Sequence, residues 1–232
     1  MEINFSDPQY YTNRELSWVL FDHRVLNEAR DKSIPLFERL KFLSITASNL
    51  DEFFMIRVAS LKDMENAGYT KKDIAGMTPT EQLKALHVAI HELVDLQYST
   101  YNRSLLPLLE KNGLHIIREH EQLTAEEAAY VDAYFQENVY PVLTPMAVDS
   151  SRPFPLIRNK SLNIGAMVRK KNSDEELEFA TVQVPSVLSR VVRIPSKGKN
   201  CKIILLEEII ERNMDKLFLN YDIVCAHPFR IM

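Results

Sequence analysis

The chain has 232 residues, of which 46% are hydrophobic and 26% charged, and its formal net charge at pH 7 is −4. This composition indicates a globular protein of one or two domains with enough apolar side chains for a sizeable core. A surface devoted to a polyanion would carry excess Lys and Arg, so the acidic balance argues against nucleic acid as a partner and leaves only local cationic patches.

Glycine and cysteine usage exclude several kinds of site. The five glycines lie far apart, so the chain contains neither a GxxxxGK[ST] loop nor a GxGxxG turn. Cys201 and Cys225 have no CxxC partner, which favours reduced thiols. No apolar run reaches the ~18 residues of a transmembrane segment, and the acidic N-terminus lacks a signal-peptide pattern. We therefore expect a cytoplasmic location, with peripheral membrane attachment left open.

The first predicted helix begins at Thr12. Thr12 and Glu15 have the spacing of a capping box, in which the hydroxyl accepts from a backbone amide and the carboxylate bonds the cap amide. Its buried side consists of apolar residues at helical spacing, namely Leu16, Val19, Leu20, Val25, Leu26 and Ala29.

The longest predicted helix covers residues 35–64 and organises the first part of the chain. It carries two apolar stripes at helical spacing. The first comprises Leu36, Leu40, Leu43, Ala47, Leu50, Phe54, Val58 and Leu61, and the second Phe42, Ile45, Phe53 and Ile56. The second stripe has one polar interruption, Asn49, which lies four residues after Ile45 and four before Phe53.

Asn49 is the first candidate binding residue. A buried amide needs partners, because an unpaired buried polar group costs about 1–3 kcal/mol. Its donor and acceptor suit the edge of a heterocycle, with Phe53 one turn away to stack on a ring and Arg57 near the same face to reach an anion. The alternatives are that Asn49 bonds neighbouring backbone and that Arg57 pairs with Asp51, Glu52 or another helix.

A third helix is predicted from Thr78 to about Lys111. Thr78 and Glu81 form a second capping box, Pro79 occupies the first turn, Pro107 predicts a kink, and Gly113 closes the helix. Three long amphipathic helices joined by turns predict an antiparallel helical bundle over residues 1–112.

Residues 113–232 predict a second domain of α+β class with a mainly antiparallel sheet. A third capping box, Thr124 with Glu127, opens a helix through Val139, and a proline-rich loop follows. Short strands are predicted at residues 114–117, 162–168, 179–184, 191–194, 203–206 and 221–226, with a helix at 207–218.

Other candidate sites are weaker. His87 and His91 have a spacing that can chelate zinc, but only the adjacent Glu92 could serve as a third ligand, so we predict no metal site. Arg152, Arg158 and Lys160 form a small positive patch that could contact phosphates, although a solvated loop is the simpler reading. No arrangement of nucleophile and base stands out, so we assign no catalytic residue.

Three stretches together resemble the front half of the large bacterial polyphosphate kinases. They are NRELSWVLFDHRVLNEARD, PLFERLKFLSITASNLDEFFMIRVASLK and PVLTPMAVDSSRPFPLIRNKSLNI. The resemblance implies an enzyme that reversibly transfers the terminal phosphate of ATP to polyphosphate. It also implies an N-terminal helical domain, here 1–112, and an α+β head domain that takes part in forming a homodimer, here 113–232.

The resemblance implies that the Asn of SNLDEFF, here Asn49, contacts ATP, with Phe53 and Arg57 as weaker candidates. The phosphoacceptor histidine, the magnesium-binding segment and the polyphosphate tunnel would lie in later domains, so Mg²⁺ is not expected to bind here. We expect the chain to be the truncated front part of the enzyme and inactive alone. The alternative is a non-enzymatic interaction module made of the same two domains.

Overall fold

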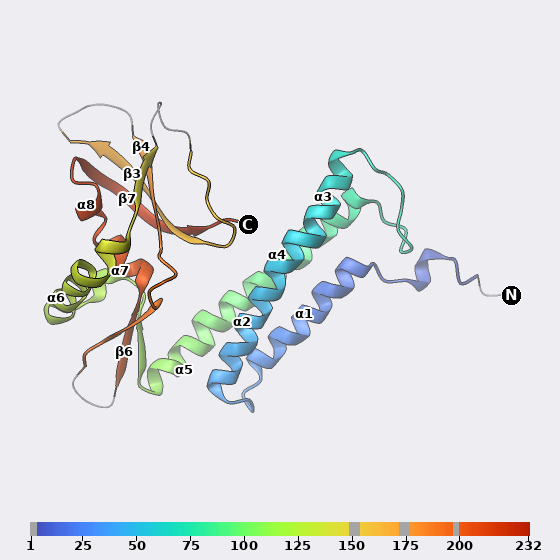
Figure 1. Ribbon diagram of the computed structural model, residues 1–232. Coiled ribbons are helices and arrows are strands. Elements are labelled where there is room, and N and C mark those ends of the chain that lie inside the picture. Colours follow the sequence, from blue (N-terminus) through green and yellow to red (C-terminus); the bar gives the residue numbers. More distant parts are fainter. Residues whose placement is uncertain (1–3, 149–153, 172–176, 197–199) are drawn as a thin grey trace. The chain divides into compact units, whose positions relative to one another are not determined.

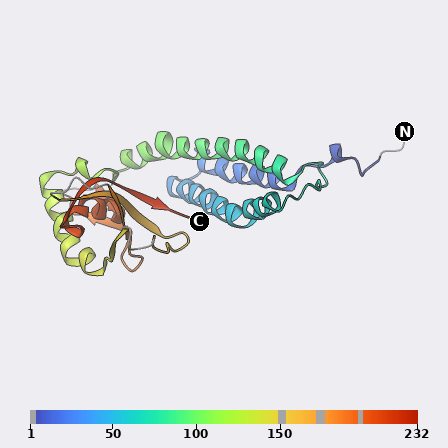
Figure 2. The same cartoon turned by 90° about the horizontal axis from the view of Figure 1, so that it is seen from above.

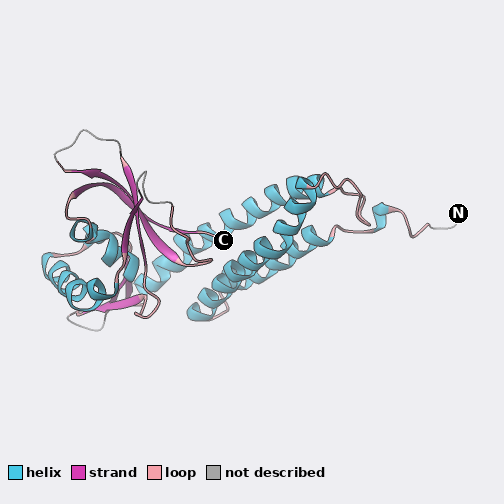
Figure 3. Ribbon diagram, turned by 45° about the horizontal axis from the view of Figure 1, so that its top comes forward, coloured by secondary structure: helices cyan, strands magenta, loops and turns pink. Residues whose placement is uncertain are grey.

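The computed structural model describes residues 4–148, 154–171, 177–196 and 200–232. It divides into two compact units, Met1–Lys111 and Asn112–Met232. The first is helical, and the second combines helices with β-sheets (Figure 3).

The helical unit is built from three rods that lie side by side, as Figures 1 and 2 both show. It begins with the short 3-10 helix η1 (Pro8–Tyr10). The first rod is α1 (Arg14–Arg30). The second runs without a break through α2 (Leu36–Phe53), the π-helical segment η2 (Phe54–Val58) and α3 (Ala59–Asn66). The third runs through α4 (Pro79–Thr100), the π-helical segment η3 (Tyr101–Leu105) and α5 (Leu106–Lys111).

The helix starts are set by side-chain caps, and one prediction about them was wrong. The Thr78–Glu81 capping box is present. At α1, however, the cap is Asn13 rather than Thr12, because Asn13 Oδ1 accepts from the backbone N–H groups of Glu15 and Leu16 at 3.1 and 2.9 Å. Asn13 Nδ2 also donates to Asp73 Oδ2 at 2.7 Å, a partner 60 residues away.

The core of the helical unit contains much of the first predicted stripe of residues 35–64. Leu43 and Leu61 are buried, and Leu36, Leu40, Leu50, Phe54 and Val58 pack against them. The second stripe differs from the prediction. Phe53 is buried, but Ile45 and Ile56 are 44% and 59% exposed. The face that carries Asn49 is therefore partly open to solvent.

The second unit contains short helices and two sheets. Its helical segments are η4 (His120–Gln122), α6 (Ala125–Tyr134), η5 (Phe135–Val139), η6 (Tyr140–Val142), α7 (Leu206–Arg212) and α8 (Met214–Leu217). Its strands are β1 (Leu114–Ile117), β2 (Pro145–Val148), β3 (Leu162–Lys170), β4 (Glu178–Gln183), β5 (Val191–Ile194), β6 (Cys201–Leu205) and β7 (Tyr221–Arg230). The Thr124–Glu127 capping box opens α6 as predicted.

The sheets confirm the predicted α+β class with mainly antiparallel pairing. The strand orders are β1-β6-β5 and β2-β4-β3-β7. Among the described strands, the pairing of β1 with β6 is parallel and the others are antiparallel. The prediction missed β2, which lies at a sheet edge and begins with Pro145, where a missing N–H is tolerated. Side chains of α6, η5 and α7 share one core with β3, β4, β5 and β6.

Candidate functional site

Asn49 lies on α2 and faces α1. The side chain is half-buried, and its Nδ2 donates to Asp22 Oδ1 at 2.9 Å. The partner is thus a carboxylate on a neighbouring helix, not the main-chain group that the simpler alternative expected. This bond holds the Nδ2 end of the amide group.

Asp22 is a fully buried carboxylate. It has 0% exposed surface, and its Oδ2 is buried without a hydrogen-bond partner within the described residues. Burial raises the pKa of Asp22 to about 6, and the hydrogen bond from Asn49 opposes this shift in part. At neutral pH the group is mainly ionised and can only accept hydrogen bonds.

The charge of Asp22 sets the orientation of the Asn49 amide. An ionised carboxylate attracts the N–H end of an amide and repels its carbonyl end. The Oδ1 of Asn49 consequently points away from Asp22. It accepts no hydrogen bond within the described residues and is not among their buried atoms, so it can receive one from a bound molecule.

Phe53 lies in the core of the helical unit, one turn after Asn49 on the same helix. Its ring is 2% exposed and stacks on Trp18 with centroids 4.1 Å apart and planes 9° from parallel. Trp18 already occupies one face of the ring. The structure therefore places Phe53 one turn from Asn49, as expected, but against an aromatic neighbour on α1.

Arg57 lies in the π-helical segment η2, which follows α2. Its Nη1 is 3.9 Å from Glu15 Oε1, a long ion pair across to α1. Burial raises the pKa of Glu15, and the nearby charge of Arg14 opposes the rise. Arg57 thus faces the neighbouring helix, as one sequence alternative expected, while its side chain stays 40% exposed.

Sequence reasoning missed Asp22 and Trp18 as members of this site. A signal for Asp22 was present, since it lies three residues after Val19 and four before Leu26, on the apolar side of its helix. A carboxylate in such a position needs a partner, and the facing helix offers one in Asn49.

The cavity and the histidine pair of the helical unit involve residues other than Asn49. A cavity of about 440 Å³ is lined by a different set of residues, among them Phe54, His87 and His91. His91 Nδ1 lies 2.7 Å from the carbonyl oxygen of His87, one turn earlier. Among the described residues no group of three His, Cys, Asp or Glu side chains could hold a metal ion.

Two further findings concern the described residues of both units. Cys201 and Cys225 are free thiols, as expected. In the described ranges no helix combines the length and the apolar character needed to cross a bilayer.

Comparison with known families matches both units. Residues 11–117 match the family described as "Polyphosphate kinase N-terminal domain", and residues 126–232 match "Polyphosphate kinase middle domain". The resemblance noted in the sequence is therefore confirmed for both parts of the chain.

Individual relatives agree with this assignment. The polyphosphate kinase of Lactiplantibacillus plantarum is 50% identical over 230 residues, which are 99% of this chain and 32% of the relative. That of Bacillus anthracis is 46% identical over 233 residues, 99% of this chain and 33% of the relative. The crystal structure of polyphosphate kinase from Porphyromonas gingivalis superposes with a TM-score of 0.83 at 28% identity, covering 95% of this chain and 32% of that one.

The chain spans about a third of the length of these curated relatives. Two adjoining family matches and relatives of 42–50% identity leave one conclusion. The chain belongs to the polyphosphate kinase family, of which it contains the N-terminal and middle domains.

Proposed function

We propose that this chain supplies part of the ATP site of an enzyme that reversibly transfers the terminal phosphate of ATP to polyphosphate. Asn49 is the residue that contacts the nucleotide base. The observation that carries this proposal is the Asn49 amide, whose Nδ2 is held by buried Asp22 while its Oδ1 has no partner within the described residues.

This orientation favours adenine over guanine. The outward Oδ1 is an acceptor, and the exocyclic amine of adenine is a donor. Guanine presents a carbonyl oxygen at the equivalent edge, and two acceptors cannot bond each other. Ile45, one turn before Asn49 and 44% exposed, offers apolar surface beside the amide for the plane of a base.

Phe53 and Arg57 take secondary roles in the proposal. Phe53 contributes through its stack on Trp18, which packs α1 against α2 one helical turn from Asn49. Arg57 can turn from its long contact with Glu15 toward an anionic group, because a 3.9 Å ion pair holds a side chain only weakly.

The remaining steps of the reaction are assigned to segments outside this chain. A histidine nitrogen there would attack the γ-phosphorus of ATP, which breaks the bond to the bridging oxygen and releases ADP. A terminal oxygen of the polymer would then accept the phosphoryl group from the phosphohistidine, which frees the histidine. Mg²⁺ would neutralise the phosphate charge at the same place. The unit Asn112–Met232 would take part in forming a homodimer.

The test is an Asn49→Ala substitution in a complete polyphosphate kinase that carries this sequence. Losing the base contact raises the KM for ATP about tenfold with little change in kcat, because the interaction binds substrate and transition state alike. Asn102→Ala, which changes an exposed amide in η3, is the matched control. An unchanged KM for Asn49→Ala favours the alternative of a non-enzymatic interaction module.

A further inference from the structure

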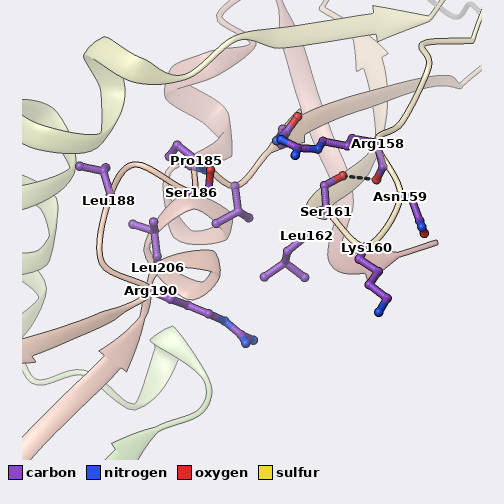
Figure 4. Close-up of a pocket in the computed structure, with 12 residues that line it drawn as sticks. Arg158, Asn159, Lys160, Ser161, Leu162, Pro185, Ser186, Leu188, Arg190 and Leu206 are labelled. Carbon is purple, nitrogen blue, oxygen red and sulfur yellow. Dashed lines mark hydrogen bonds between the residues drawn. The ribbon is translucent and has the colours of Figure 1, made fainter. Parts of the chain in front are cut away.

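The second unit contains a cavity of about 520 Å³ that the proposed ATP contact does not use. It lies between the turn that leads into β3 and the segment that follows β4 (Figure 4). Its lining residues are Arg158, Asn159, Lys160, Ser161, Leu162, Gln183, Val184, Pro185, Ser186, Leu188, Arg190 and Leu206. The volume falls within the range of about 300–1,000 Å³ that is usual for small-ligand sites.

The cavity carries an excess of positive charge. Arg158, Lys160 and Arg190 line it, and among the described residues Arg158 and Lys160 form no ion pair. Arg190 is held by Glu207, a buried carboxylate that accepts from both Nε and Nη2 of the guanidinium. One carboxylate against three cations leaves a net charge of about +2, which attracts an anion.

The turn that presents two of these cations is held by several hydrogen bonds. Ser161 donates from its backbone N–H and from Oγ to the Arg158 carbonyl, at 3.0 and 2.7 Å. The backbone N–H of Lys160 donates to the Ile231 carbonyl at 3.0 Å, and Asn163 Nδ2 donates to both oxygens of Ser161. Figure 4 shows Ser161 and Leu162 between Arg158 and Arg190.

Lys160 has an unusual backbone conformation for a residue with a side chain. Its φ is 60°, in the left-handed region where Gly or Asn is normally preferred. Such strain persists only where the surrounding structure enforces it, and it concentrates at binding sites. A lysine at this position costs stability that a glycine would not, which argues for a role of its ammonium group.

We propose that this cavity binds a base-free phosphoanion, specifically a segment of inorganic polyphosphate. Guanidinium and ammonium groups beside Ser186 and Gln183 provide the charged and neutral donors from which phosphate oxygens accept hydrogen bonds. The residues that line the cavity include no aromatic ring on which a base could stack. The identity of the anion rests on the proposed function, whereas the preference for a phosphoanion rests on the cavity itself.

This interpretation replaces the solvated loop that the sequence favoured for the positive patch. Of the three predicted patch residues, Arg158 and Lys160 line the cavity, and Arg152 lies outside the described residues. Arg190 comes from a separate segment and completes the set, which sequence spacing alone could not reveal.

The test is calorimetric titration of the purified chain with inorganic tripolyphosphate at low ionic strength. Saturable binding is expected, and Arg158→Gln and Lys160→Gly each weaken it about five- to tenfold through loss of one charge-assisted contact. Arg169→Gln is the matched control, since it removes an exposed charge near the other end of β3 and should change the affinity by less than about twofold. Lys160→Gly keeps the turn, because glycine adopts the same φ freely, and thermal melting of each variant verifies folding.

Three results would overturn the proposal: no saturable binding, equal weakening by Arg169→Gln, or equal weakening by Asn49→Ala. The last would place the anion at the nucleotide site instead. If only the proposed ATP contact is wrong, the result is different. Asn49→Ala then leaves ATP binding unchanged, while Arg158→Gln and Lys160→Gly still weaken the binding of tripolyphosphate.

Discussion

Asn49 donates a 2.9 Å hydrogen bond to Asp22 and thereby joins α2 to α1 at a carboxylate with no exposed surface. The second oxygen of that carboxylate is buried and has no partner within the described residues. A buried charge with one hydrogen bond is costly for folding, and such costs persist where a binding site needs them. We therefore expect that changes which remove the charge of Asp22 stabilise the fold and weaken ligand binding at Asn49.

Asp22→Asn should stabilise the chain at neutral pH. Because the pKa of Asp22 is raised to about 6, the folded state binds its proton more tightly than the unfolded state does. That contribution to the free energy of unfolding is complete below about pH 4 and is lost as the pH rises through 6. We expect Asp22→Asn to gain about 1–2 kcal/mol at pH 7.5 and close to nothing at pH 4.

Urea unfolding at both pH values measures this difference. Asp95→Asn is a suitable control, since it makes the same chemical change elsewhere in the helical unit. A gain that is equal at pH 4 and pH 7.5 would mean that the carboxylate charge is not its source.

ATP binding should weaken as Asp22 takes up its proton. A protonated carboxyl can donate to Asn49 Oδ1, which turns the amide and withdraws the acceptor from the base. Trp18, the single tryptophan, stacks on Phe53 beside this pair and reports binding by fluorescence. We expect the affinity for ATP to fall several-fold between pH 7 and pH 5.

Protonation of ATP itself also affects this titration, so the comparison is with Asp22→Asn, which binds the same ligand. The parent chain and the variant should differ in the shape of the pH profile near pH 6. Parallel profiles would show that Asp22 does not control the orientation of the amide.

Sequence patterns predicted the elements of this fold well wherever the determining contacts are local. The Thr78 and Thr124 capping boxes need only residues three apart, and both are present. The start of α1 was misplaced by one residue because Asn13 has a second partner, Asp73, on a loop far along the chain. Asn49 stood out as a polar gap in an apolar stripe, but its partner Asp22 depends on how two helices pack, which periodicity does not encode.

Asn13→Ala should destabilise the chain, and Thr12→Ala should not. Asn13 satisfies two backbone donors of the first turn of α1 and also anchors the loop that carries Asp73. Loss of an N-cap costs about 1–2 kcal/mol, whereas Thr12 is exposed and has no cap bond to lose. Thermal melting of the two variants compares neighbouring residues directly, and similar losses in both would restore Thr12 as the cap.

The chain alone should not transfer phosphate between ATP and polyphosphate. It spans about a third of the length of its curated relatives, and the proposed function assigns the phosphoryl-transfer step to residues outside it. Incubation with γ-labelled ATP, Mg²⁺ and polyphosphate measures both polymer growth and labelled protein. Measurable turnover by purified chain would contradict the assignment of the phosphohistidine to later domains.

Protonation of Glu127 should lower the stability of the second unit in acid. It closes the capping box of α6 and accepts from Lys202 on β6. The hydrogen bond from Lys202, followed by that from the Thr124 backbone, holds the pKa of Glu127 below its usual value. The carboxylate therefore stabilises the fold above the unfolded-state pKa of 4.5, and this contribution is lost as the pH falls through the lower folded-state pKa.

Glu127→Gln and Glu127→Ala separate the two roles. Gln retains a polar group that can bond the cap amide but loses the charge, so it should cost about 1 kcal/mol, and Ala about 2–3 kcal/mol because it loses both contacts. In a double-mutant cycle with Lys202→Met, the coupling energy should be about 1–2 kcal/mol at pH 7 and should shrink as the pH falls through the lowered folded-state pKa of Glu127. A coupling that is independent of pH would show that Lys202 stabilises the unit through packing of its alkyl chain, since protonation of Glu127 removes the charge and leaves the hydrocarbon contacts in place.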